Sequence, residues 1–271
     1  MTTLSRGDIG PLPAPAAPSG GWIVVMTQEL RDVWLSARGP VLVLVFSLLL
    51  SLLTYLAATN KELNIIDQKD TVNLVMQLTL GIGVAASLLF SADTLSGERE
   101  RETLESLLLT PVPRRQIALG KLLAAASVWP VMIVVAVPYV WALKGGAGLL
   151  ADAVLAGFVV GSLLTAAFGS LGLTVSIFSN SNRLSLVLSF FLFVVLLAPT
   201  QLPLSGWFGD LIANINPVTA GSAFLDKVIV KQHGWGQEST LLIAPILAAL
   251  LATSVAFLVA GRLRLRGGMG R

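Results

Sequence analysis

Long apolar runs dominate the chain, and six of them are long enough to cross a lipid bilayer as helices. A spanning helix needs about 20 mostly apolar residues, and only a helix or a closed barrel satisfies its backbone hydrogen bonds in hydrocarbon. The pattern therefore predicts an all-α polytopic membrane protein. The predicted spans cover residues 40–59, 72–95, 117–143, 150–178, 184–204 and 240–261.

Two segments precede the first span. Residues 1–20 are rich in proline, alanine and glycine, a composition that buries too little apolar surface to fold, so we expect a disordered cytoplasmic tail. They also lack the pattern of a secretory signal. Residues 21–38 carry apolar residues at helical spacing, including Trp22 and Trp34, which predicts an amphipathic helix at the membrane interface. A short helix packed on a partner is the alternative, and residues 39–271 then form the transmembrane domain.

Composition agrees with a membrane protein and narrows its chemistry. Hydrophobic residues make up 55% of the chain and charged residues 12%, whereas soluble domains are about 25% charged. The chain has no cysteine, which excludes disulfides, thiolate metal sites and thiol nucleophiles. The net charge of +3 comes from basic residues beside apolar runs, so we expect no nucleic-acid partner.

The distribution of basic residues predicts the topology. If the termini and the second and fourth connections share one side, that side holds every arginine and Lys121. The other side holds the remaining lysines, which are Lys61, Lys69, Lys144, Lys227 and Lys231. Because cytoplasmic loops carry an excess of basic residues, we expect a multi-pass protein of the plasma (inner) membrane with both termini in the cytoplasm.

Three features within the domain carry further expectations. Pro130 and Pro138 should kink or loosen the third span, since each removes a backbone donor. The fourth span has a stripe of small residues for close helix packing, for which we favour a partner helix of the same chain over a dimer interface. In residues 206–238, the apolar pattern predicts two short helices that are broken at 216–217 and dip part-way into the outer leaflet; His233 there is expected to be solvated. The small residues of the stripe are Gly157, Gly161, Thr165, Gly169 and Gly172.

Residues 96–121, SGERERETLESLLLTPVPRRQIALGK, are the one densely charged stretch. With Ser96 as the helix cap, Glu98, Glu102 and Glu105 would share one face of a helix. Leucines would occupy another face, and Pro111 and Pro113 would end the helix. The stretch could be a solvated loop, a membrane-surface anchor or a docking element for a cytoplasmic partner. Exposed carboxylates argue against an anchor on anionic lipids.

The stretch resembles the permease subunits of type-2 ATP-binding-cassette (ABC) exporters. Their pattern after the second span is E-R-E-x-G-T-L-E-x-L-L-x-x-P-x-x-R-x-x-I-x-x-G-K. Glu102 departs from it where glycine is common, and we expect glutamate to favour helix continuity by up to about 1 kcal/mol. The resemblance extends to the interfacial helix, the six spans and an Asn-Pro before the sixth span. The matching residues are Glu98, Arg99, Glu100, Thr103, Leu104, Glu105, Leu107, Leu108, Pro111, Arg114, Ile117, Gly120 and Lys121.

The resemblance implies that this stretch is a coupling helix seated in a cleft of a cytoplasmic ABC ATPase. The chain contains no GxxxxGK(S/T) phosphate loop, so we expect ATP and Mg on a separate ATPase subunit and no cofactor on this chain. A transporter of this family also needs a second permease, either a second copy or a paralogue. The implied contact residues are Glu98, Arg99, Glu100, Glu102, Thr103, Leu104, Glu105, Leu107, Leu108, Pro111 and Arg114.

Two other classes of function compete with an ABC permease. An ion-coupled secondary carrier usually has ionisable groups near mid-membrane, whereas Asp93 and Asp152 lie close to helix ends. An intramembrane enzyme needs a catalytic constellation, and a lone histidine without cysteine offers little to build one. The uncharged interiors of the spans favour a lipidic or amphipathic cargo that is exported.

Overall fold

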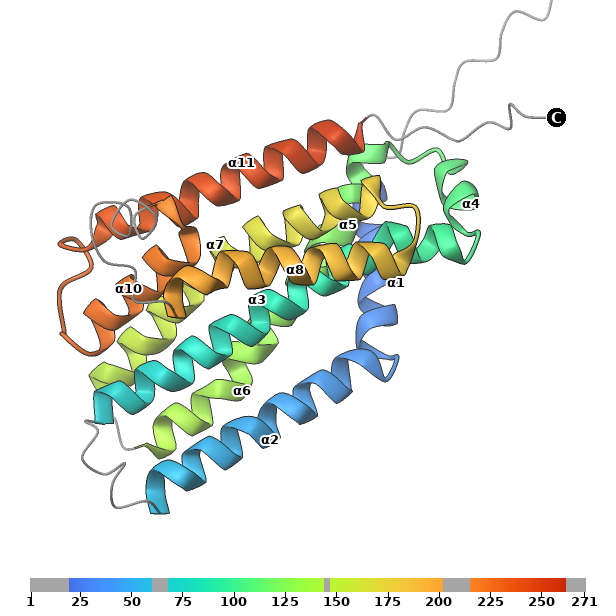
Figure 1. The fold of residues 1–271 in the computed structure, drawn as a ribbon. Helices are drawn as coiled ribbons and strands as arrows, with labels where there is room; N and C mark the ends of the chain where they lie inside the picture. The colour runs from blue at the N-terminus through green and yellow to red at the C-terminus, as the bar shows by residue number, and fades with distance from the viewer. Residues whose placement is uncertain (1–19, 60–67, 144–146, 202–214, 262–271) are drawn as a thin grey trace, which may run out of the picture.

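The protein is a bundle of long helices aligned along one direction (Figure 1). The computed structural model describes residues 20–59, 68–143, 147–201 and 215–261. Within these ranges there are no strands, and six helical spans are long and apolar enough to cross a membrane. The all-α polytopic fold class is therefore confirmed for this part of the chain. The spans are Arg38–Ala57, Gln68–Glu100, Arg114–Ala142, Leu149–Phe178, Asn182–Pro199 and Ser239–Ala260.

Two helices form the centre of the bundle, α3 (Gln68–Glu100) and α7 (Ala147–Phe178), which pack together along their length. Around them lie α6, α8 and α11, while α2 lies at the edge of the bundle and packs mainly on α6 (Figure 1). The remaining elements are α1 (Gly21–Trp34), α2 (Arg38–Thr59), α4 (Leu104–Leu108), α5 (Arg114–Ala126), α6 (Val128–Ala142), α8 (Asn182–Gln201), α10 (Pro217–Ile229), η2 (Ser239–Leu242) and α11 (Ile243–Ala260).

The small-residue stripe of α7 is covered by helices of the same chain. A Cβ atom added at Gly172 would overlap the backbone of Leu88 in α3, and one added at Gly157 would overlap the side chain of Met76. Gly161 faces the indole of Trp129 in α6 in the same way. The stripe therefore lets α3 and α6 approach α7 closely, and intrachain packing, rather than a dimer interface, is confirmed for these glycines.

The third span is broken, as the prolines predict, and the break lies at Ser127 between α5 and α6. Pro130 comes three residues later, where its ring would clash with the carbonyl of Ala126 in a continuous helix. Pro138 lies inside α6 without ending it. The two halves still form a single apolar stretch of spanning length.

The second of the two short helices predicted in residues 206–238 is α10, whereas the first falls largely on residues 202–214, outside the described residues. Asn216 caps α10, because its Oδ1 accepts a hydrogen bond from the backbone N–H of Val218 at 2.9 Å. The helical part of this segment that the structure describes, α10, is covered by protein. Its apolar face, with Phe224 and Leu225 fully buried, packs into the main core beside α7 and α3.

His233, which we expected to be solvated, is exposed and also contacts Glu238. Its Nδ1 lies 2.7 Å from Glu238 Oε1, although about half of the imidazole remains exposed. Lys227 Nζ donates to the other carboxylate oxygen at 2.7 Å. The hydrogen bonds from Lys227 and then from His233 lower the pKa of Glu238. This cluster fixes the chain between α10 and η2.

Candidate functional site at the α3 to α5 connection

The charged stretch does not begin with a helix cap, because α3 continues through Ser96 to Glu100. Ser96 is fully buried, and its hydroxyl donates to the carbonyl of Ala92 at 2.6 Å. Its backbone N–H also lies 2.8 Å from Ser176 Oγ in α7. The predicted capping role of Ser96 is therefore wrong, and this residue instead ties the end of α3 to α7.

A sharp break then separates α3 from α4, and Glu102 makes it. Glu102 has a φ of 59°. The backbone N–H of Glu102 donates to Arg99 O at 3.2 Å, and that of Thr103 donates to Glu98 O at 3.0 Å. These two bonds, together with the left-handed conformation of Glu102, define a Schellman motif at the end of α3. Glycine usually occupies the left-handed position of this motif. The expectation that Glu102 favours helix continuity is wrong, because it occupies the position where the helix ends.

Glu102→Gly should stabilise this turn by about 1 kcal/mol, since a left-handed conformation costs a non-glycine residue about 1–2 kcal/mol and glycine loses more chain entropy on folding. The measurement is amide hydrogen exchange at α4, where Leu107 and Leu109 donate to the carbonyls of Thr103 and Glu105. We expect slower exchange in Glu102→Gly. Glu105→Gly is the matched control and should speed exchange, because Glu105 lies inside α4. Equal effects of both substitutions would contradict the assigned turn.

The acidic residues of the stretch do not share one helix face, because the break at Glu102 lies between them. Glu102 and Glu105 are exposed, whereas Glu98 points into the protein and is about one-fifth exposed. Leu104 anchors α4 by packing against a cluster that includes Leu95 and Ala260. α4 itself projects beyond the end of the bundle (Figure 1). The exposed element of the connection is therefore a short helix of five residues.

The other predicted contact residues are distributed around this short helix. Thr103 and Pro111 are exposed, Leu107 is half-buried, and the side chain of Leu108 lies outside the description. Arg114 begins α5 and is half-buried. These residues lie on and beside α4.

Lys121 is the most buried charge of this region and forms a three-residue ion-pair cluster, which we call the Lys121 cluster (Glu29, Glu98 and Lys121). The ammonium group is 1% exposed and lies 2.7 Å from Glu98 Oε1 in α3. It also pairs with Glu29 in α1. The cluster joins α1, α3 and α5 directly beneath the α3 to α4 turn.

The predicted amphipathic helix is α1, which packs lengthwise on α5. At Gly120, an added Cβ would lie 2.7 Å from the backbone oxygen of Trp22 and 2.9 Å from Val25 Cβ. Gly120 therefore permits the close approach that places Glu29 beside Lys121. Trp34 adds a hydrogen bond from its indole N–H to Ser127 Oγ at 3.0 Å.

Arg99 and Glu100, which are predicted to contact a partner, also bind neighbouring helices of this chain. Arg99 donates to the carbonyls of Ser179 and Ile177, which are unpaired acceptors at the C-terminus of α7. Glu100 Oε2 accepts from the backbone N–H of Asn182 at 3.1 Å and so caps the start of α8. The end of α3 therefore fixes the turn between α7 and α8.

A second ion pair extends this network to α2. Arg38 Nη1 lies 2.6 Å from Asp93 Oδ2, and Asn182 Nδ2 donates to Asp93 Oδ1 at 2.6 Å. Asn182 Oδ1 in turn accepts from Ser96 Oγ at 3.1 Å. Asp93 is thus part of a structural network at one end of the bundle. Hydrogen bonds and one ion pair that involve side chains therefore connect the ends of α2, α3, α7 and α8.

The charged and polar groups at this end of the bundle connect several helices. Within the described ranges, no cluster of three His, Asp or Glu side chains could hold a metal ion. The buried polar groups pair with one another across helices, so a displacement of the α3 to α5 connection would move α1, α7 and α8 as well. An exposed element mounted on such a network is typical of a docking site for another protein.

These observations describe an all-helical protein with six helices long enough to span a membrane and a short exposed helix, α4, at one end of its bundle. The chain matches the ABC-2 family transporter protein family over residues 23–264 and belongs to that family. It is therefore an ABC-type permease, the membrane component of a transporter that pairs with an ATP-binding subunit. No match was found among curated proteins.

Proposed function

We propose that the chain is the permease subunit of an ABC exporter in the plasma membrane and that α4 docks on a separate ATPase subunit. The observation that carries this proposal is the position of α4. It projects beyond the bundle with Glu102 and Glu105 exposed. It follows directly from α3, whose end is bonded to α5, α7 and α8, and Lys121 of α5 is bonded in turn to α1.

The proposed orientation places both termini and α4 in the cytoplasm. It is supported by the positions of the arginines and Lys121, which all belong to that side. ATP and Mg would bind the ATPase subunit, and a second permease, either a copy or a paralogue, would complete the membrane part. Closure of the two ATPase subunits would draw the two α4 elements together, and each movement would pass into α3 and α5.

A test of docking should replace the exposed acidic residues Glu102 and Glu105 and leave Glu98 of the Lys121 cluster unchanged. Glu98 is bonded to Lys121, so its replacement would disturb the permease itself. The exposed carboxylates of Glu102 and Glu105 report on the contact with the partner. We expect Glu102→Lys and Glu105→Lys each to weaken assembly with the ATPase about thirtyfold, which corresponds to a loss of about 2 kcal/mol at a desolvated charge pair.

The measurement is the affinity of the purified permease for its ATPase and the ATPase activity of the reconstituted complex. Asp152→Lys is the matched control, because it reverses a charge at the other end of α7 and should leave assembly unchanged. Unaltered assembly and ATP turnover in both α4 variants would contradict the docking role. Weakened assembly in Asp152→Lys as well would show a general effect of added positive charge.

A further inference from the structure

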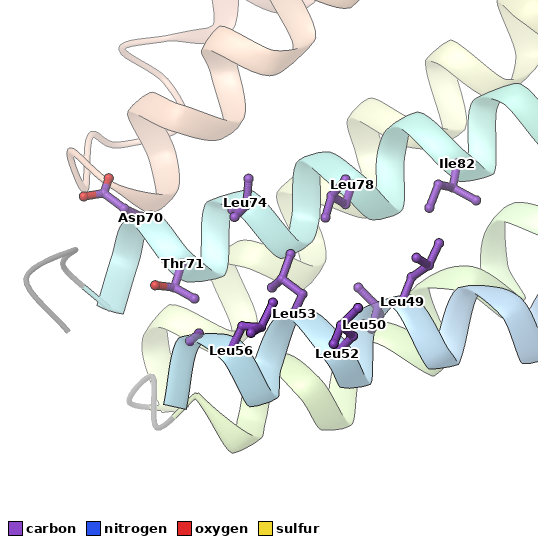
Figure 2. Close-up of a pocket in the computed structure, with 11 residues that line it drawn as sticks. Leu49, Leu50, Leu52, Leu53, Leu56, Asp70, Thr71, Leu74, Leu78 and Ile82 are labelled. Atoms are coloured by element: carbon purple, nitrogen blue, oxygen red, sulfur yellow. The ribbon is translucent and has the colours of Figure 1, made fainter. Parts of the chain in front are cut away.

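An apolar cleft lies between α2 and α3, toward the end of the bundle remote from α4, and Figure 2 shows its lining. Its volume is about 420 Å³, which falls in the range of pockets that bind small molecules. Leu53 points from α2 toward α3, and Leu74, Leu78 and Ile82 lie along α3 opposite it (Figure 2).

The cleft exists because α2 is attached to α6 more than to α3. Tyr139 in α6 bonds to two serines of α2, with its hydroxyl 2.7 Å from Ser47 Oγ and 2.9 Å from Ser51 Oγ. Phe46 and Leu50 of α2 are buried in the main core. These contacts hold one side of α2 against the bundle, so its other side and α3 form the two walls of the cleft.

The lining determines what can occupy the cleft. Nine of its eleven lining residues are apolar, namely Leu49, Leu50, Leu52, Leu53, Leu56, Ala57, Leu74, Leu78 and Ile82. Water or a polar molecule would lose its hydrogen bonds there. The two polar residues, Thr71 and Asp70, lie together at one end, and the Asp70 carboxylate points away from the leucines (Figure 2). The cleft thus matches an amphipathic molecule with a long apolar part.

Charge determines which end group would suit this molecule. Asp70 is exposed and, in the parts of the chain that the structure covers, has no basic partner. An amine would gain a favourable interaction with this carboxylate, whereas a phosphate with only negative charge would be repelled. A membrane lipid with a primary-amine head group meets both requirements.

We propose that the cleft between α2 and α3 binds one acyl chain of a phosphatidylethanolamine, with the amine of its head group beside Asp70. The exposed apolar side chains of α8, among them Val187 and Val195, serve as the comparison surface. Regarding the bound lipid as the transported cargo rests on the proposed function, whereas the existence of the lipid site does not. Binding itself is measured without ATP and without the ATPase subunit.

The test uses the full chain in bilayer nanodiscs that contain phosphatidylethanolamine with a photoreactive acyl chain. After irradiation, mass spectrometry locates the labelled peptides. We expect labels concentrated on residues 49–57 and 70–82. Leu53→Trp and Leu74→Trp should each reduce this labelling about tenfold, because displacing even two methylene groups from an apolar site changes binding by about that factor.

Val187→Trp and Val195→Trp are the matched controls, because these α8 side chains are 65% and 48% exposed and lie away from the cleft. They should leave the cleft labelling unchanged. Equal labelling of α8 and the cleft in the unsubstituted protein would overturn the proposal, whether or not the tryptophan variants fold.

Asp70→Asn tests the head group separately. It should remove a preference for phosphatidylethanolamine over phosphatidylglycerol, measured with photoreactive forms of both lipids. An unchanged preference, or none in the unsubstituted protein, would overturn the assignment of the amine to Asp70. Cleft labelling that persists in a chain unable to stimulate its ATPase would show that the proposed function fails while the lipid site stands.

Discussion

Lys121→Met is expected to lower the free energy of unfolding by about 3–5 kcal/mol, the usual effect of removing one partner from a buried ion pair. The Lys121 ammonium is 1% exposed and is the shared ion-pair partner of two carboxylates, those of Glu29 and Glu98. Methionine fills a similar volume but leaves both acids without a cation. The loss should appear as a lower midpoint of thermal unfolding of the permease in detergent.

Two further variants separate the ion pairs from ordinary packing. Lys231→Met removes an exposed partner of Asp226, with 3.6 Å between the charged atoms, and should change stability by only about 0–1 kcal/mol. Combining Lys121→Met with Glu29→Gln and Glu98→Gln should recover much of the loss, because no unpaired charge then remains. A single Lys121→Met as mild as Lys231→Met would contradict the cluster.

Local patterns predicted the membrane character of the fold. The apolar runs gave six spans because helix length and hydropathy are read from consecutive residues. Pro130 predicted the break in the third span for the same reason, since its effect extends only to the preceding turn. The apolar residues of 206–238 also indicated a helix that starts at 217, but not that it is buried in the core.

The charge of residues 96–121 singled out this connection in the sequence, but the shape of the connection was not predicted correctly. Helical spacing treats Glu98, Glu102 and Glu105 as one continuous face, and the left-handed backbone at Glu102 interrupts it. The position of glycine in the family pattern was the available signal, since glycine is favoured where φ is positive. Because glutamate favours helices, its presence at that position predicted a continuous helix and not a turn.

The Lys121 cluster was missed because its partners are distant in sequence. Lys121 and Glu29 are 92 residues apart, and no periodicity joins them. Its neighbour Gly120 was matched only as part of a motif, although its missing side chain allows α1 to approach α5. The bonds of Arg99 and Glu100 to the α7 to α8 turn were likewise not predicted, because they depend on tertiary packing.

Gly161→Ala is expected to destabilise the protein by about 1–3 kcal/mol, the range for overfilling a packed core. The indole of Trp129 lies between two glycines, Gly161 of α7 and Gly83 of α3, and an added Cβ at either position would come within 2.6 Å of the ring or overlap it. Trp129 is 1% exposed, so the ring has no free space into which it could move. The measurement is again the midpoint of thermal unfolding in detergent.

Gly81→Ala is the matched control, because an added Cβ there meets no atom within 4 Å. It should be neutral or stabilise α3 by up to about 1 kcal/mol, the usual difference between glycine and alanine inside a helix. Trp129→Phe should reduce the effect of Gly161→Ala, with a coupling of about 0.5–3 kcal/mol in a double-mutant cycle. Additive effects would mean that the indole does not hold α6 between α3 and α7.

If the indole of Trp129 holds these three helices together, they move as one block. A displacement of the α3 to α5 connection then reaches α7 through the Trp129 contact as well as through the bonds of Ser96 and Arg99.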